Sequence, residues 1–324
     1  MKEIVVTKND SGQRADRFLK KYLRNAPLSV IYKVLRKDLK VNGKRVKEDY
    51  GLEEGDVLQL YVTDEDFDNW TKKKTSDGKK AKKQFSVLYE DDDVIIVNKP
   101  FGLLVHGDKS EKKDTLANQV VDYLIEEGSY VPRNERTFVP SPVHRLDRNT
   151  TGIVVFGKNA ESLRQLSKMF REEKSDSVRK FYYTFVHGSL REPLHLKGKI
   201  LKDEHKNVAR VLPENDERGK YIETIVNPVA VSKDGKYSLV EIELVTGRSH
   251  QIRAHLAYAG HPLVGDTKYG GKELKSKEGD WSLGRTTQAL HAHRIIIGDI
   301  DCEAPLPEAW KSMQKELLGK EIIK

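Results

Sequence analysis

The stretch from residue 143 to residue 157 constrains the fold most, because it places a charged side chain just before an apolar run. Residues 149–152, Asn-Thr-Thr-Gly, predict a turn, since Asn tolerates unusual backbone angles and Gly adopts them without penalty. Residues 153–156, Ile-Val-Val-Phe, have the β-branched and aromatic composition of a short buried strand. Asp147 is therefore expected at the mouth of a sheet.

A carboxylate in that position needs an explanation. An unpaired carboxylate near a core lowers the stability of the fold. Asp147 therefore requires cationic or hydrogen-bonding partners unless it takes up a proton. Arg145 and Arg148 flank it in the sequence. One interpretation is a structural aspartate that turns the chain and pairs with one of these arginines, and the other is a functional carboxylate. This stretch alone favours the structural interpretation.

Composition narrows the class of protein. A chain of 324 residues is long enough for two or three domains, and its formal net charge of +8 favours an anionic partner, nucleic acid first. Cys302 is the sole cysteine, which excludes an intramolecular disulfide and a thiolate metal cluster. No apolar run approaches the ~20 residues of a membrane helix, and the polar start lacks a signal-peptide core. We expect a cytoplasmic monomer.

The first 62 residues have the pattern of a small separate module. Residues 15–22 and 29–36 predict two short helices, the second capped by Ser29. Residues 41–46 predict a hairpin around Asn-Gly, and residues 57–62 predict a strand.

Basic residues fall on or beside the two predicted helices, where they can form one face for phosphates. An ordinary solvated face explains the same residues equally well. The order of the module's motifs nevertheless resembles the S4 RNA-binding domain: Arg14-x-Asp16-Arg17-Phe18, then the second helix, Val41-Asn42-Gly43-Lys44 and Gly55-Asp56-Val57. This resemblance implies an RNA-binding face formed by Arg17, Lys33, Arg36 and Lys37.

Residues 63–84 are rich in lysines and acids and poor in apolar side chains, so we predict a flexible linker and place the domain boundary there. From residue 85 to residue 324 the pattern is that of one large domain. Strands joined by hairpins alternate with a few helices, as at 236–245, where apolar and acidic residues alternate. We predict an α+β domain with a largely antiparallel sheet.

Metal ligation receives little support from the histidines. His250 and His255 are five residues apart, which does not place them on one face of a helix, and no Cys or Glu completes a ligand set. His291 and His293 point the same way on a predicted strand, but a pair alone is weak evidence. We predict neither a metal nor a cofactor.

Four segments of the large domain together resemble the RluA-type pseudouridine synthase family, and the match runs from residue 85 to about residue 318. They are Asn98-Lys99-Pro100 with Gly102, His144-Arg145-Leu146-Asp147 with Thr151-Gly152, Lys180-Phe181-Tyr182, and Thr246-Gly247-Arg248 through His250-Gln251-Ile252-Arg253-x-His255. The segment from Gly260 to Asp266 continues it. The resemblance implies isomerisation of uridine in RNA, with the base detached at N1 and rejoined through C5.

The resemblance also implies roles for individual residues. Asp147 is the catalytic carboxylate, Arg253 its paired arginine, and Tyr182 the residue that stacks on the target base. Tyr183, next in sequence, leaves that last choice open. Further substrate contacts are implied for Arg145, which replaces the flipped base, and for Ile252, Lys99, Arg248 and His250. His144 is interpreted as structural.

The substrate class is less constrained than the chemistry. Ribosomal RNA is favoured, and tRNA remains open. A kinase is excluded because no glycine-rich phosphate loop or Asp-Phe-Gly accompanies His-Arg-x-Asp, and a glycosidase lacks a second acid. An inactive RNA-binding assembly factor remains an alternative. The charged segments 189–220 and 272–284 can either select the RNA or form solvent-facing loops.

Overall fold

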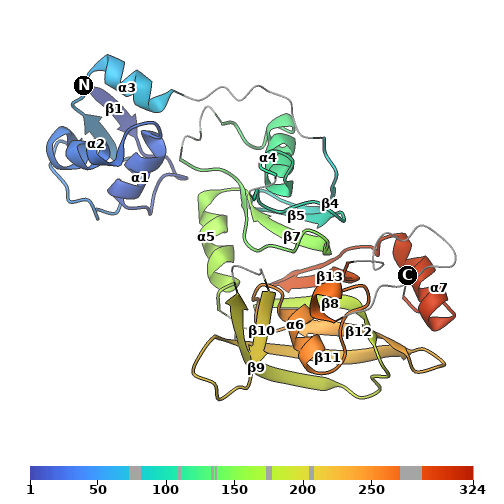
Figure 1. Cartoon of the computed structure of the whole chain (residues 1–324). Helices are drawn as coiled ribbons and strands as arrows, with labels where there is room; N and C mark the ends of the chain where they lie inside the picture. Colours follow the sequence, from blue (N-terminus) through green and yellow to red (C-terminus); the bar gives the residue numbers. More distant parts are fainter. Residues whose placement is uncertain are drawn as a thin grey trace. The chain divides into compact units, whose positions relative to one another are not determined.

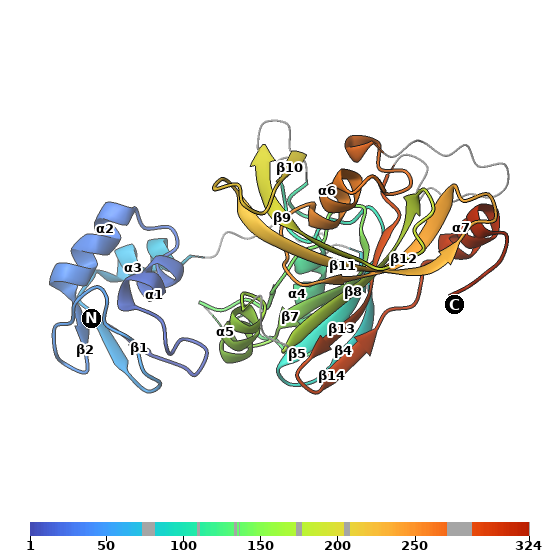
Figure 2. The same ribbon diagram turned by 90° about the horizontal axis from the view of Figure 1, so that it is seen from below.

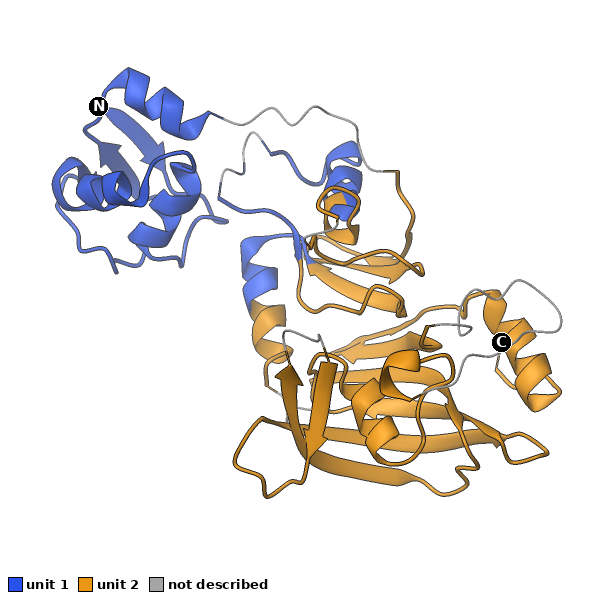
Figure 3. Cartoon of the chain, in the orientation of Figure 1, with its two compact units in different colours: residues 1–81, 119–141, 157–164 blue, residues 82–118, 142–156, 165–324 orange. Residues whose placement is uncertain are grey.

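The computed structural model describes residues 1–72, 82–108, 111–132, 135, 137–172, 177–203, 208–270 and 287–323. The chain forms two compact units (Figure 3). The first contains residues 1–81, 119–141 and 157–164, and the second contains residues 82–118, 142–156 and 165–324. The first unit thus includes two segments that the sequence analysis placed in the large domain.

The N-terminal part of the first unit packs short helices against a three-stranded sheet with the order β1-β3-β2 (Figure 1). Its elements are β1 (Lys2–Val5), α1 (Ala15–Tyr22), α2 (Leu28–Lys33), the π-helical turn η1 (Val34–Asp38), β2 (Leu39–Val41), β3 (Val57–Leu60) and α3 (Asp64–Thr71). Phe18, Leu19 and Leu58 are completely buried in its core. Asn9 contacts the remainder of this unit, since its Oδ1 accepts from Ala160 N at 2.9 Å.

Two local predictions in this module differ from the structure. The Asn42-Gly43 turn forms with positive φ at both residues, and Val41 bridges Lys44, but residues 44–46 form no strand, and β2 pairs with β3. The reason is that the Asn42 side chain binds the start of β3, donating to Asp56 Oδ1 at 2.7 Å and accepting from Val57 N at 2.9 Å. Helix α2 follows Pro27 and has no side-chain cap, so the predicted cap by Ser29 is wrong.

The first part of the predicted linker is ordered. Within residues 63–84, helix α3 begins after Thr63, whose Oγ1 accepts from Asp66 N at 3.1 Å. Phe67 and Trp70 pack against the core of the module, so this segment buries enough apolar surface to order itself. Residues 73–81 lie outside the described residues.

The second unit is organised around an eleven-stranded sheet with the order β10-β9-β11-β12-β8-β13-β7-β5-β4, in which β14 pairs with β13 and β6 with β7 (Figures 1 and 2). Strands β8 and β12 pair antiparallel, whereas β7 and β13 pair in parallel. The predicted α+β class with a largely antiparallel sheet is confirmed. The strands are β4 (Ser86–Glu90), β5 (Val94–Lys99), β6 (Ser141–Pro142), β7 (Thr151–Gly157), β8 (Val178–His187), β9 (Leu194–Asp203), β10 (Val208–Leu212), β11 (Lys220–Val231), β12 (Tyr237–Leu244), β13 (Leu290–Ile297) and β14 (Ile300–Glu303).

The helices that follow along the chain are α4 (Leu116–Glu126), α5 (Ala160–Met169), α6 (Gln251–Tyr258), the 3-10 turn η2 (Thr267–Tyr269) and α7 (Ala309–Leu318). Helix α6 lies against β10 and β11, and α7 against β12 (Figure 2). Within the charged segment 189–220, residues 194–203 and 208–212 form strands β9 and β10, and residues 213–219 form a loop before β11; residues 272–284 lie outside the described residues. Among the described helices, none is long and apolar enough to cross a bilayer.

Strand β7 is buried along its whole length and is the strand that follows Asp147. At its start, Gly152 has φ +106° and lies opposite Ala292 of β13, so a Cβ at this position would overlap the Ala292 carbonyl oxygen. The parallel contact between β7 and β13 therefore requires glycine for two reasons, its backbone angle and the close approach of the partner strand.

We predict that Gly152→Ala lowers the free energy of unfolding by about 3 kcal/mol, since the positive φ costs about 1–2 kcal/mol and overpacking another 1–3. Gly298→Ala is the matched control, because Gly298 also has positive φ, +53°, but has nothing near its missing Cβ. Denaturant unfolding of both variants measures the difference. Equal losses would show that the strand contact relaxes around a methyl group.

Candidate active site

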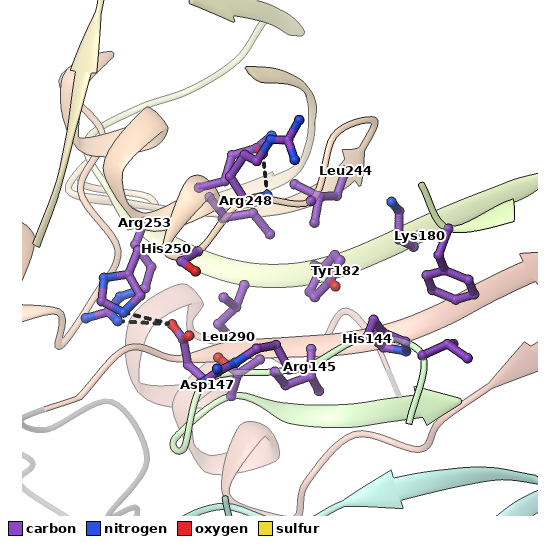
Figure 4. A pocket seen from close by; sticks show the side chains of 18 of the residues that line it. His144, Arg145, Asp147, Lys180, Tyr182, Leu244, Arg248, His250, Arg253 and Leu290 are labelled. Atoms are coloured by element: carbon purple, nitrogen blue, oxygen red, sulfur yellow. Dashed lines mark hydrogen bonds and ion pairs between the residues drawn. The ribbon is translucent and has the colours of Figure 1, made fainter. Parts of the chain in front are cut away.

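A cavity of about 530 Å³ opens in the second unit. Three parts of the chain contribute most of its wall: the loop that precedes β7, strand β8, and the turn that enters α6 (Figure 4). Each part comes from one of the predicted motif segments. The lining includes Val143, His144, Arg145, Leu146, Asp147, Thr150, Lys180, Tyr182, Leu244, Arg248, His250, Ile252, Arg253 and Leu290.

Asp147 lies in this cavity with a quarter of its side chain exposed. Its Oδ2 atom receives Arg253 Nη1 at 3.1 Å, and His250 Nε2 approaches the same atom at 3.7 Å. Figure 4 shows both side chains pointing toward this one oxygen. Within the described residues, neither Arg253 nor His250 meets Oδ1, which leaves that oxygen available for chemistry.

Arg253 also binds a second carboxylate, that of Asp266, to which the sequence analysis gave no role. Asp266 accepts two bonds from it, at 2.6 Å from Nε and 2.8 Å from Nη2, and only 1% of the Asp266 side chain is exposed. Burial opposes the charge of Arg253, but hydrogen bonds and charges from Asp266 and Asp147 outweigh it and raise the Arg253 pKa. The guanidinium therefore stays charged and has one fixed orientation. The sequence signal for Asp266 was its place at the end of the segment from Gly260 to Asp266, which continues the family resemblance.

His250 begins α6 in a left-handed conformation, φ 58°, which non-glycine residues adopt rarely. His250 is the cap residue of this helix, and no side chain caps the helix. Burial lowers the His250 pKa, Arg253 and Lys268 lower it further, and Asp147 opposes them. The ring is therefore neutral at neutral pH.

Gln251 fixes the turn that carries Arg248 and His250, a role that sequence spacing does not reveal. Its Oε1 accepts from Arg248 N at 3.0 Å and from Thr246 Oγ1 at 2.9 Å. Its Nε2 donates to Glu223 O and to Thr224 Oγ1, both at 3.0 Å. All four hydrogen bonds that a buried amide can make are present, so the turn is rigidly attached to β11.

Alternation along β8 places the two neighbouring tyrosines on opposite faces of the sheet. Tyr182 lines the cavity and is 6% exposed, whereas Tyr183 stacks on His293 with ring centroids 3.8 Å apart and is absent from the lining. Burial raises the Tyr182 pKa, and the charge of Asp147 raises it further. Tyr182 is therefore a neutral phenol.

The other predicted contacts divide into cavity and non-cavity residues. Ile252 is buried in the wall, and Arg145 is exposed at the cavity. Lys99 is fully buried, and its ammonium donates to the carbonyls of Pro100, Leu103 and Arg148 at 2.7–2.9 Å. All three of its protons are used within the protein, so the predicted substrate contact is corrected: Lys99 ties the loop after β5 to the loop that carries Asp147.

His144 has the structural position that was predicted for it. Its ring stacks on Phe170 at 4.9 Å, and its Nε2 accepts from Val155 N at 3.2 Å. Burial lowers its pKa to about 3. The neutral ring therefore attaches the loop to β7.

Among the described residues, no group of three His, Cys, Asp or Glu side chains could hold a metal ion. His255 Nδ1 meets Thr224 Oγ1 at 3.0 Å, and His291 Nδ1 meets Thr151 Oγ1 at 2.8 Å. His293 instead faces Glu241 at 3.0 Å. These histidines have separate protein partners.

In the N-terminal module, the four predicted RNA contacts are all exposed. Arg17 lies on α1, Lys33 ends α2, and Arg36 and Lys37 belong to η1. A hollow of about 630 Å³ takes in Arg36 but not the other three. Three further cations line it together with two acids: Arg14, Arg45 and Lys47, with Glu48 and Asp49.

The cavity thus brings a carboxylate paired with a buried arginine together with a tyrosine and an isoleucine on a mixed sheet. Comparison with known proteins identifies the class of enzyme. The chain belongs to the RNA pseudouridylate synthase family, whose model matches residues 93–258. Members of this family are isomerases, and the predicted activity is confirmed at this level.

Individual relatives cover most of the chain. It is 35% identical over 299 residues to the ribosomal large subunit pseudouridine synthase C of Vibrio vulnificus, covering 91% of this chain and 88% of that protein. It is 31% identical to the protein of the same name from Escherichia coli, covering 98% and 97%. The structure of human RNA pseudouridylate synthase domain containing 4 superposes with a TM-score of 0.56 at 20% identity, covering 74% of this chain and 95% of that one, which shows the shared fold.

We predict that Lys99→Met slows turnover about 10- to 100-fold, because the loop carrying Asp147 loses the group that holds it and small displacements of a catalytic group have effects of this size. Burial lowers the Lys99 pKa to about 7, and the charge of Asp147 opposes this shift. The buried ammonium therefore depends on the three backbone carbonyls that accept its protons. Lys220→Met, at an exposed position of β11, is the control. Unchanged turnover with weakened RNA binding would instead restore the role of substrate contact.

Proposed function

We propose that this enzyme converts uridine to pseudouridine in large-subunit ribosomal RNA, with Asp147 as the catalytic carboxylate. The observation that carries the proposal is the environment of Asp147: a buried, doubly anchored arginine meets one oxygen, and the other oxygen remains open to the cavity. A carboxylate with one oxygen paired to an arginine and the other open suits attack on a ribose.

The reaction breaks the bond between N1 of uracil and C1′ of the ribose and forms a bond between C5 and C1′. N1 gains a proton and C5 loses one, so the change is an isomerisation. Asp147 lines the cavity and can act through Oδ1 either by bonding to C1′ or by taking a ribose proton. Arg253 stabilises the carboxylate through Oδ2 in either case.

Tyr182 and Ile252 form apolar walls on which the detached uracil can rest while it rotates. Because the Tyr182 pKa is raised, the phenol remains protonated at neutral pH. This supports Tyr182 as a stacking surface and a hydrogen-bond donor. It disfavours a phenolate base for the C5 proton.

A uridine stacked in RNA cannot reach Asp147, so the nucleotide must flip out at a cost of a few kcal/mol. Arg145 is exposed at the cavity, and its planar guanidinium can occupy the space that the base leaves. Arg248, also at the cavity, can contact a flanking phosphate.

The N-terminal module is proposed to bind RNA as an S4 domain. Its hollow gathers Arg14, Arg36, Arg45 and Lys47, and the exposed cations Arg17, Lys33 and Lys37 lie on its helical elements. The two acids in the hollow reduce the net charge. Cations on a concave surface beside helices are suited to phosphates of folded RNA.

The proposed target rests on the relatives, whose names specify the large ribosomal subunit. A tRNA target is the second candidate. Loss of turnover, the remaining alternative, is disfavoured because Asp147, Tyr182 and Arg253 meet in one cavity. A cytoplasmic location remains part of the proposal.

We predict that Asp147→Asn abolishes turnover in cells that otherwise lack the protein, because the amide cannot act as the nucleophile or base. Mapping of pseudouridines in total RNA should show large-subunit sites restored by the wild-type protein and not by the variant. In vitro, the affinity of the variant for RNA should stay within about tenfold, since one charge contributes little beside many phosphate contacts. Restoration of these sites by the variant would refute the role of Asp147. If the wild-type protein restored sites in tRNA instead, tRNA would replace ribosomal RNA as the proposed substrate.

We predict that a triple variant, Arg36→Ala with Arg45→Ala and Lys47→Ala, weakens RNA binding and reduces the slope of log affinity against log salt by about 2, close to 0.7–0.9 for each lost phosphate contact. A second triple variant, Lys311→Ala with Lys315→Ala and Lys320→Ala, removes the same charge on and after α7. If the two triple variants had equal slopes of log affinity against log salt, the hollow would have no specific role in RNA binding.

A further inference from the structure

Tyr269 ends η2 and connects several parts of the site, although neither its sequence context nor the family motifs drew attention to it. Its hydroxyl oxygen lies 2.8 Å from His250 Nδ1 and 2.8 Å from the backbone nitrogen of Ala209 in β10. Its ring faces the Arg253 guanidinium at 5.1 Å and meets the His250 ring edge-on, at 87°. It also packs against the small core beneath α6.

The two hydrogen bonds of the hydroxyl determine where the protons lie. The backbone N–H of Ala209 can only donate, so the Tyr269 oxygen accepts there. The hydroxyl has one proton of its own, and within the described part of the chain His250 Nδ1 is its one remaining partner. An Nδ1–H donor would leave the hydroxyl proton without a partner among these residues, whereas donation from Tyr269 to Nδ1 satisfies both groups. We take this arrangement, in which Nδ1 carries a lone pair.

A neutral imidazole with its lone pair at Nδ1 carries its proton at Nε2. His250 Nε2 is the atom that faces Asp147 Oδ2, at 3.7 Å. The bound tautomer thus presents an N–H dipole to the carboxylate. The other tautomer would direct a lone pair at the same oxygen, which is repulsive.

We propose that Tyr269 is a positioning residue that holds His250 in the Nε2–H tautomer, so that a donor faces Asp147 through the reaction. The proposal rests on the catalytic role assigned to Asp147. The left-handed backbone of His250 supports it, since a strained conformation at this position keeps the ring in a fixed place.

The charges around His250 set the pH dependence. Asp147 and Asp266 favour a charged ring, whereas Arg253, Lys268 and burial oppose it, and the His250 pKa is lowered overall. The hydroxyl of Tyr269 adds to this opposition, because a donor bound to Nδ1 blocks protonation there. Without the hydroxyl, His250 should take up a proton at a higher pH, pair with Asp147 and weaken its reactivity.

The direct test is nuclear magnetic resonance of the full-length protein with ¹⁵N-labelled histidine, in which two-bond ¹H–¹⁵N correlations distinguish the tautomers. A His250→Gln sample assigns the signals. We expect the Nε2–H form in the wild-type protein at pH 7.5 and a mixture, or the other form, in Tyr269→Phe, which keeps the ring and removes the hydroxyl. Tyr258→Phe, at a 62% exposed tyrosine of α6, should match the wild type.

Turnover measurements complete the test. In Tyr269→Phe we expect kcat to fall about 10-fold with KM for RNA changed less than about 2-fold, and the acid limb of the pH–rate profile to move to higher pH. A wild-type Nδ1–H tautomer would overturn the proposal even if the variant failed to fold. An unchanged tautomer and pH profile in a folded variant would also overturn it. The tautomer is read without any RNA, so this result is independent of whether Asp147→Asn retains turnover.

Discussion

The site depends on one guanidinium shared by two carboxylates. Asp266 binds Arg253 through two nitrogens and leaves Nη1 for Asp147, so the arginine is oriented before any substrate arrives. A buried arginine with a single carboxylate would be neutralised by it. With two carboxylates, one of them almost completely buried, the cation pairs with Asp147 while engaging only one of its oxygens.

Other buried polar groups fix the remaining segments of the cavity wall by hydrogen bonds. Lys99 attaches the Asp147 loop to the loop after β5, and Gln251 attaches the turn before α6 to β11. Tyr269 links His250 to β10. Each group makes at least one hydrogen bond to a segment distant in sequence, which makes a polar network in a core rigid. The reactive loops are therefore fixed by contacts that lie behind the cavity wall.

Much of the site could be predicted because its residues occur in ordered motifs. Asp147, Arg253, Ile252 and Arg145 do line one cavity. Lys99 was assigned wrongly because a motif lysine beside a glycine turn has the same sequence pattern whether its ammonium faces RNA or backbone carbonyls. The Asn42-Gly43 turn forms as expected, but β2 pairs with β3 and not with the residues directly after the turn. The reason is that strand pairing depends on tertiary contacts and not on turn geometry alone.

By itself the sequence determined the α+β class, the buried strand after Asp147 and the family, because apolar periodicity and motif order are local properties of a chain. Only the tertiary structure decided that Tyr182 and not Tyr183 faces the cavity, because alternation along β8 separates the two faces without saying which one is hollow. It also decided the roles of Asp266 and Tyr269. Their functions consist of hydrogen bonds to Arg253, His250 and Ala209, and such partners are chosen by packing in three dimensions.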